Sequence, residues 1–216
     1  MPAATTAVPA RPLTWGPHEV PVPYVVRWSS ERVSARGVTV RADGSGLSYE
    51  DERPADRDAH GVLWAREPHT PGEGRPNYRS MHSSRQRSVV RTLSCQVCGG
   101  RADRNGQGWL FILPRTDADP EGSLCTKPPM CTPCSKLALR HCPHLADAIA
   151  LRVRKPRVWG ALGDVYVPTG PDRRVRCIPS HGYLAYGDAA APWFLAAQLV
   201  LELRRVRRAA LPHPSV

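Results

Sequence analysis

Residues 130–136, MCTPCSK, place a C-x-x-C pair at the start of a helix-forming stretch, and this pair is half of the pattern that decides the fold. The other half is CQVCGG at residues 95–100. Two such pairs supply four thiolates, which is the usual ligand set of a closed structural zinc site. We therefore expect one zinc ion to be bound by Cys95, Cys98, Cys131 and Cys134.

The residues beside each pair favour this interpretation. Gly99 and Gly100 follow the first pair, and glycine tolerates the positive φ of a tight knuckle. In the second pair Thr132 can cap a helix and Pro133 can be its first residue. Cys134 then lies in the first helical turn, where the helix dipole stabilises a thiolate.

A knuckle, an intervening strand (WLFIL, residues 109–113) and a helix carrying two ligands resemble the treble-clef zinc finger. The resemblance covers residues 93–146 and implies that the same four cysteines are the metal ligands. The chain departs from the compact pattern at a Pro- and Asp-rich insertion, residues 113–129, where a tight hairpin would suffice.

Four further potential ligands lie close in sequence: Cys125, His141, Cys142 and His144. We expect them to pack around the site, although the C-P-H sequence could replace one of the four thiolates. Cys177 is expected to be a small buried apolar residue. Four thiolates leave no open coordination position, which indicates a metal that supports the fold and does no chemistry.

The chain of 216 residues has a formal net charge of +11, which makes nucleic acid the first candidate partner. Its 30 basic residues include only three Lys, a bias that GC-rich codon usage also explains. Residues 1–60 are slightly acidic, so the positive charge lies in the half that carries the cysteines. The candidate nucleic-acid contacts there are Arg85, Arg87, Arg91, Arg101, Arg104, Lys136 and Arg140.

Hydrophobic patterning predicts an α+β fold of mostly antiparallel strands with the treble-clef-like finger embedded in it. The apolar run 189–201 and the basic RRVRR that follows (204–208) predict a buried C-terminal helix, and the acidic segment 50–61 a hairpin loop. The expected divisions are a disordered arm (1–18), an N-terminal β region (19–66), a Pro/Gly linker (67–82), a basic helix with the four-cysteine zinc finger (83–146), and strands with the C-terminal helix (147–211).

Across its length the chain is similar to uncharacterised proteins of high-GC Gram-positive bacteria and their phages. The phrases that carry this resemblance include DRDAHGVLWAR, RQRSVVRTLSCQVCGG and PPMCTPCSKLALRHCPHL. It implies no activity. We expect a cytoplasmic protein with reduced thiols and no membrane partner, because no secretory signal or spanning apolar segment is recognisable.

These observations predict a zinc-stabilised, non-catalytic binding module that contacts DNA or RNA through a basic face. An alternative is a protein-interaction or scaffolding module that binds another protein or itself through residues 190–208. A His-metal nuclease on a treble-clef scaffold ranks third, because no His lies on the strand that would donate the base. The H-x-E motif of zinc deaminases, a phosphate loop and a nucleophile elbow are all missing from the sequence.

Overall fold

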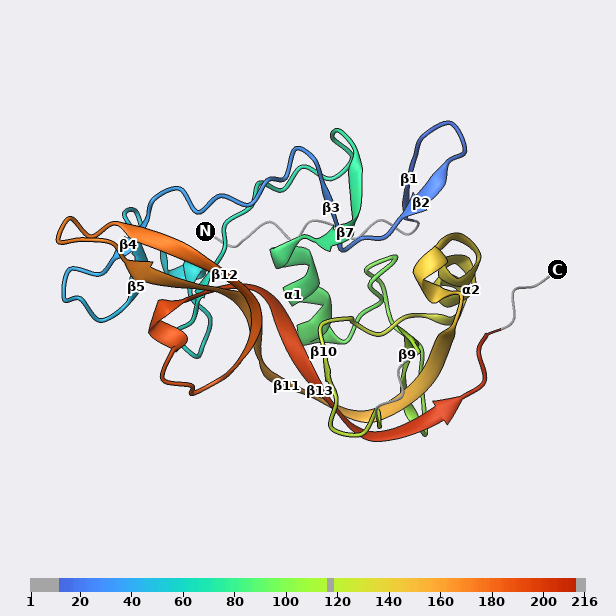
Figure 1. Ribbon diagram of the computed structural model, residues 1–216. Coiled ribbons are helices and arrows are strands. Elements are labelled where there is room, and N and C mark those ends of the chain that lie inside the picture. The colour runs from blue at the N-terminus through green and yellow to red at the C-terminus, as the bar shows by residue number, and fades with distance from the viewer. Residues whose placement is uncertain (1–11, 116–118, 213–216) are drawn as a thin grey trace.

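The computed structural model describes residues 12–115 and 119–212 and shows a mixed α+β protein built mostly of antiparallel strands (Figure 1). The largest sheet contains β6 (Leu63–Trp64), β8 (Arg104–Asn105), β9 (Gly108–Pro114), β10 (Leu124–Cys125), β11 (Ala148–Pro168), β12 (Val175–Ala185) and β13 (Phe194–Ala209). Three two-stranded sheets pair β1 (Leu13–Trp15) with β2 (Val20–Val22), β3 (Val26–Trp28) with β7 (Pro76–Met81), and β4 (Val38–Val40) with β5 (Leu47–Tyr49). The helices are α1 (Ser83–Thr92) and α2 (Thr132–His141), with short 3-10 turns η1 (Pro54–Asp56), η2 (Pro143–Leu145) and η3 (Ala191–Trp193).

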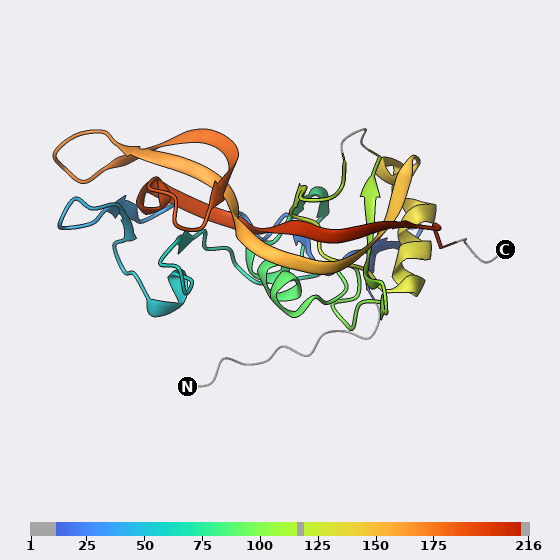
Figure 2. The same cartoon turned by 90° about the horizontal axis from the view of Figure 1, so that it is seen from below.

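Two long strands, β11 and β13, organise the molecule. They pair antiparallel from Ala150 opposite Ala209 to Val165 opposite Phe194. On the edge of β11 that faces away from β13, β9 pairs with the first part of β11 and β12 with the last part. On the other side, β10 and β6 pair with β13. Figure 2 shows the two strands running along the molecule, with α2 at one end and the β11–β12 hairpin at the other.

The main core lies between α1 and the concave side of this pair of strands (Figure 1). Val90 of α1 packs in one cluster with Leu199 and Leu201 of β13. Gln86, which is fully buried, fastens the helix in place: its side-chain amide donates to the Leu199 carbonyl and accepts from the Leu199 N–H, both at 2.9 Å. Pairing both backbone groups satisfies polar atoms that would be costly to bury alone.

The prediction of a C-terminal helix is wrong, because residues 194–209 form strand β13. Its apolar residues are buried nearly continuously from Phe194 to Leu203. A central strand covered on both faces produces an uninterrupted apolar run, which periodicity alone cannot distinguish from a buried helix. Pro192 does begin a helical turn, but this is the three-residue η3, and the strand follows directly.

Other segments differ from expectation in length or pairing. Within the expected strand region 147–211, residues 148–168 form one long strand, β11. β6 pairs parallel with β13, so segment 50–61 is no hairpin loop between β5 and β6. The expected linker 67–82 contains β7, and β1 lies within the expected arm, whose residues 1–11 are outside the described part. The basic helix expected at 83–93 is confirmed as α1.

A buried ion pair joins the N-terminal region to α1. The two Nη atoms of Arg85 each donate to a Glu31 carboxylate oxygen at 2.6 Å, and both side chains are almost completely buried. The remaining contacts of Glu31 come from the backbone N–H groups of Trp28 and Thr70. Among the described residues, no helix is long and apolar enough to cross a membrane.

Replacing Arg85 with Met should lower the free energy of unfolding by about 3–5 kcal/mol, because Glu31 would stay buried without its charge partner. Urea unfolding followed by circular dichroism measures the change. The matched control is Arg91→Met on the same helix, whose side chain is exposed and which should cost less than about 0.5 kcal/mol. Equal losses in the two variants would contradict the assigned role of the ion pair.

Candidate metal centre

The four cysteines of the two C-x-x-C pairs meet in one cluster. Their sulfur atoms all lie within 4.8 Å of one another, and Cys98 Sγ is 4.0 Å from Cys131 Sγ. A tetrahedron of thiolates around an ion at about 2.3 Å has sulfur–sulfur edges of about 3.8 Å. Cys95 and Cys134 are buried and the other two are half-buried. The cluster therefore has the donor set, size and shielding to hold a metal ion.

The first pair sits on a glycine-supported turn. Gly99 adopts φ +71°, the left-handed conformation expected from its position after Cys98. Its N–H donates to the Cys95 carbonyl at 2.7 Å, and the Cys95 N–H donates to the Gly100 carbonyl at 2.7 Å. These bonds close the knuckle and hold both cysteines toward the second pair.

The second pair opens α2, one residue earlier than expected. Cys131 is the N-cap and Thr132 the first helical residue, so Thr132 is not the cap. Cys134 still lies in the first turn, as expected. The Thr132 hydroxyl instead donates to the Asp103 carboxylate, which also accepts from Arg152 Nη1 at 2.8 Å. Asp103 thus ties the start of α2 to β11 beside the four sulfurs.

The sulfur atoms share negative charge unevenly. Hydrogen bonds from the thiols of Cys134 and Cys95 lower the pKa of Cys131 to about 4. The hydrogen bond that Cys134 makes to Cys131 raises the pKa of Cys134. One sulfur of the cluster is thus a thiolate near neutral pH while a neighbour keeps its proton. A divalent cation at the centre would replace those shared protons and allow all four groups to ionise.

The remaining Cys and His residues lie outside the four-sulfur group in the described structure. Cys125 is buried in β10, where burial raises its thiol pKa to about 11. His141 and His144 are exposed, and Cys142 is half-buried. Cys177 packs against the hydrophobic cluster that contains Tyr166, but it is half-buried and not buried as expected.

A second group of possible ligands, Glu31, His69 and His82, also lies within 4.8 Å. The donor atoms of two members are already used: Arg85 occupies both oxygens of Glu31, and the His82 ring contacts the Pro68 carbonyl at 2.8 Å and the Ser84 hydroxyl at 3.1 Å. Burial lowers the pKa of His82 to about 4, so its ring is neutral at pH 7. With a guanidinium 2.6 Å from the carboxylate, a cation would be repelled, and we assign Glu31 and His82 to the hydrogen-bonded core.

The structure distributes the seven candidate nucleic-acid contacts over several environments. Arg85 is buried against Glu31 and cannot reach a ligand. Arg87 lies over the Trp64 ring at 4.4 Å, and Arg104 over the Trp109 ring at 4.3 Å. The others lie on α1, on the finger or on α2: Arg91, Arg101 and Arg140 are exposed and Lys136 is partly buried.

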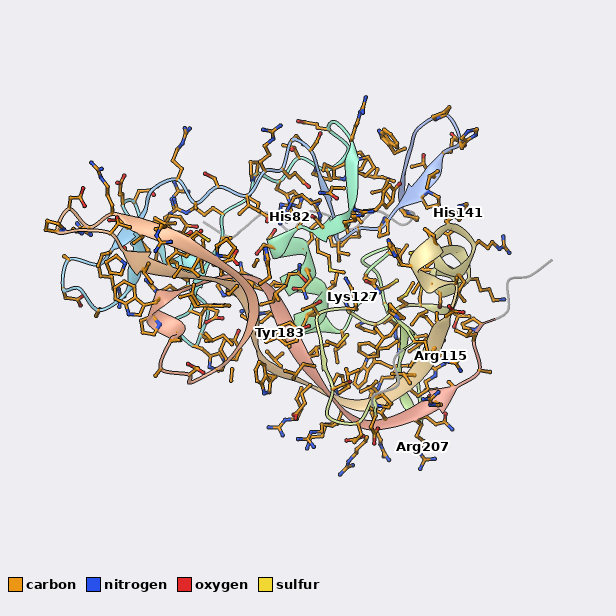
Figure 3. The ribbon with its side chains drawn as sticks, in the orientation of Figure 1. His82, Arg115, Lys127, His141, Tyr183 and Arg207 are labelled. Atoms are coloured by element: carbon orange, nitrogen blue, oxygen red, sulfur yellow. The ribbon has the colours of Figure 1, made fainter. Side chains whose placement is uncertain are left out.

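A denser set of cations lies on the paired strands β11 and β13. We call it the basic ribbon; its exposed members are Arg154, Lys155, Arg157, Arg204, Arg205, Arg207 and Arg208. In Figure 3, nitrogen-tipped side chains, Arg207 among them, fringe the side of these strands that faces away from α1. Sequence reasoning missed this surface because RRVRR was interpreted as the end of a helix.

The backbone of β13 is irregular at Arg205, within the ribbon. Arg205 has φ +56°, and the Glu121 carboxylate accepts the N–H groups of Arg205 and Val206 at 3.0 and 2.8 Å. Arg204 and Arg205 are both exposed, as are Arg207 and Arg208 after Val206, so both faces of β13 present arginines to solvent here. The carboxylate of Glu121 is thereby directed at backbone amides and forms no ion pair with a ribbon side chain in the described structure.

No protein-family model, curated protein or solved structure matches this chain.

Changing Cys131 and Cys134 together to Ser should remove the bound metal, from about one equivalent per chain to none, because two of four thiolates are lost. Elemental analysis of the purified protein measures it. The matched control, Cys142→Ser with Cys177→Ser, removes two cysteines outside the cluster and should retain the metal. Metal retained in the first variant, or lost in the control, would contradict the assignment.

Proposed function

We propose that this protein is a zinc-stabilised module that binds nucleic acid through the basic ribbon. An all-thiolate tetrahedral set favours zinc among the common divalent ions. The order of elements supports a treble-clef-like finger: the knuckle of Cys95 and Cys98 comes first, then the β8–β9 hairpin, then α2 with the other two cysteines.

The observation that carries the nucleic-acid proposal is the density of exposed cations on two paired strands. Lys155 lies opposite Arg204, and the exposed Arg154, Arg157 and Arg207 lie within three residues of that pair on the same strands. Among the described residues, Arg204 is the ribbon cation with a carboxylate partner, Glu202 at 2.6 Å. So many like charges side by side repel one another, and phosphate groups relieve that repulsion while releasing counterions.

The ribbon is also rigidly placed. Its strands pair with each other, and β11 is further paired with β9 at Arg152 and Val153. Arg152 is turned inward to Asp103, which fixes the finger end against the ribbon. Preorganised cations lose little conformational freedom when they bind phosphates, so this surface suits a polyanion better than scattered surface arginines do.

The rival interaction module rested on an apolar C-terminal helix. Residues 194–203 are instead buried in β13, so the surface that would have bound a partner lies within the fold. The nuclease rested on His141 and His144, which lie outside the metal cluster. A non-catalytic nucleic-acid module is the function that the described contacts favour.

Replacing Arg204, Arg205, Arg207 and Arg208 with Gln should weaken binding to any oligonucleotide and make it less salt-dependent. Each phosphate contact contributes about 0.9 to the slope of log K against log salt on duplex DNA, so the slope should fall by up to about 3.6. Fluorescence anisotropy over a salt series measures both quantities.

The matched control changes four exposed arginines of the N-terminal region, Arg32, Arg36, Arg41 and Arg75, to Gln. It alters net charge equally but leaves the ribbon intact, so affinity and slope should change much less. Equal effects in the two variants would show attraction by net charge alone. Failure of the wild-type protein to bind oligonucleotides at low salt would exclude the proposed function.

A further inference from the structure

A cleft opens where five parts of the chain meet. Its volume is about 440 Å³, within the range of small-molecule sites. It is lined by loop residues 57–60, Arg91 of α1, Val158 of β11, Tyr186 after β12, and Leu199 of β13. Val158 directly follows the ribbon residue Arg157 in β11, so the cleft lies next to the ribbon in sequence.

One wall of the cleft is a stacked pair of rings. The His60 ring lies on the Tyr186 ring with centroids 3.8 Å apart and planes 16° apart. Tyr186 is held from behind, because its hydroxyl donates to Asp58 Oδ2 at 2.7 Å. His60 itself is exposed, so the pair offers a second ring face to a planar group.

The carboxylate that lines the cleft, Asp58, is engaged by donors of the fold. It accepts hydrogen bonds from the Tyr186 hydroxyl, the Trp64 indole N–H, and the backbone N–H groups of His60 and Val62. Its charge is therefore spread over four donors that all belong to the fold. It acts as a positioning residue that fixes the ring pair and the 57–61 loop.

Two guanidinium groups of α1 lie at or near the cleft. Arg91 lines the cleft, and Arg87 lies one turn away over the Trp64 ring. Burial, and then the charge of Arg91, lower the pKa of Arg87, which shows that the two cations repel each other. In the described structure neither Arg87 nor Arg91 forms an ion pair with a carboxylate. An anion bound between them would therefore reduce their mutual repulsion.

We propose that this cleft binds one nucleotide of a single-stranded nucleic acid, with the base stacked on His60 and the phosphate at Arg91 and Arg87. A ring platform next to a cationic groove is the arrangement that single-strand binding requires, because every base has a stacking face. In a duplex the bases are stacked inside and cannot enter. The proposal rests on the proposed function and narrows it to single strands.

The test compares fluorescein-labelled single-stranded and duplex oligonucleotides of one sequence, as DNA and as RNA, by anisotropy. His60→Ala should weaken single-strand binding by roughly five- to a hundredfold, the loss measured when one stacking ring is removed, with duplex binding changed less than about twofold. His60→Phe keeps a stacking ring and should retain most of the affinity. His141→Ala removes an exposed histidine far from the cleft in sequence and should have no effect.

A second variant and a spectroscopic readout separate the outcomes. Arg91→Gln should also weaken single-strand binding selectively, and 2-aminopurine in the oligonucleotide should be quenched by wild type but less by His60→Ala. An equal loss of affinity for single strands and duplex, or no loss in either variant, would overturn the proposed binding of a nucleotide in the cleft. Binding through the basic ribbon could still hold in that case, and the ribbon variant would show it. Wild type that binds neither nucleic acid would instead overturn the proposed function.

Discussion

The antiparallel pairing of β11 with β13 is the constraint on which the rest of the structure depends. It runs from Ala150 opposite Ala209 to Val165 opposite Phe194, and four further strands attach to its two edges. Gln86 docks α1 on the backbone of Leu199 within this pair. Short strands of two or three residues, such as β6 and β10, have too few hydrogen bonds to be stable alone and rely on the long strands for a partner.

The same pairing creates the charged surface. Residues 154–157 and 204–208 are distant in sequence, and only their register puts Lys155 opposite Arg204. Within one strand, alternation would send half of these arginines to each face. Successive residues of both strands are exposed over this stretch, so both faces of the pair are open to solvent and carry arginines. A positive φ is costly for a non-glycine residue such as Arg205, and the hydrogen bonds that the Arg205 and Val206 N–H groups donate to Glu121 help to hold it.

Features that depend on neighbouring residues were predictable from sequence. The four-cysteine cluster follows from two C-x-x-C spacings, the turn at Gly99 from glycine chemistry, and α1 from its local pattern. Features that depend on distant partners were not. β13 is apolar on both faces because α1 and other strands cover it, a pattern shared by a buried helix. Arg85 was predicted to be a surface contact because it is an arginine in a basic helix. Its role is set instead by Glu31, 54 residues earlier in the chain.

The metal centre and the basic ribbon are mechanically connected through Asp103. Its carboxylate accepts from Thr132, which lies between two of the cysteines, and from Arg152, which lies opposite Arg207 of the ribbon. The same bond from Arg152 keeps the pKa of Asp103 below its usual range, so the link is ionic at neutral pH. A metal that holds the start of α2 therefore also holds the end of the ribbon. Under the proposed function, the four-cysteine site would serve recognition indirectly, because it would fix the geometry of cations that it does not touch.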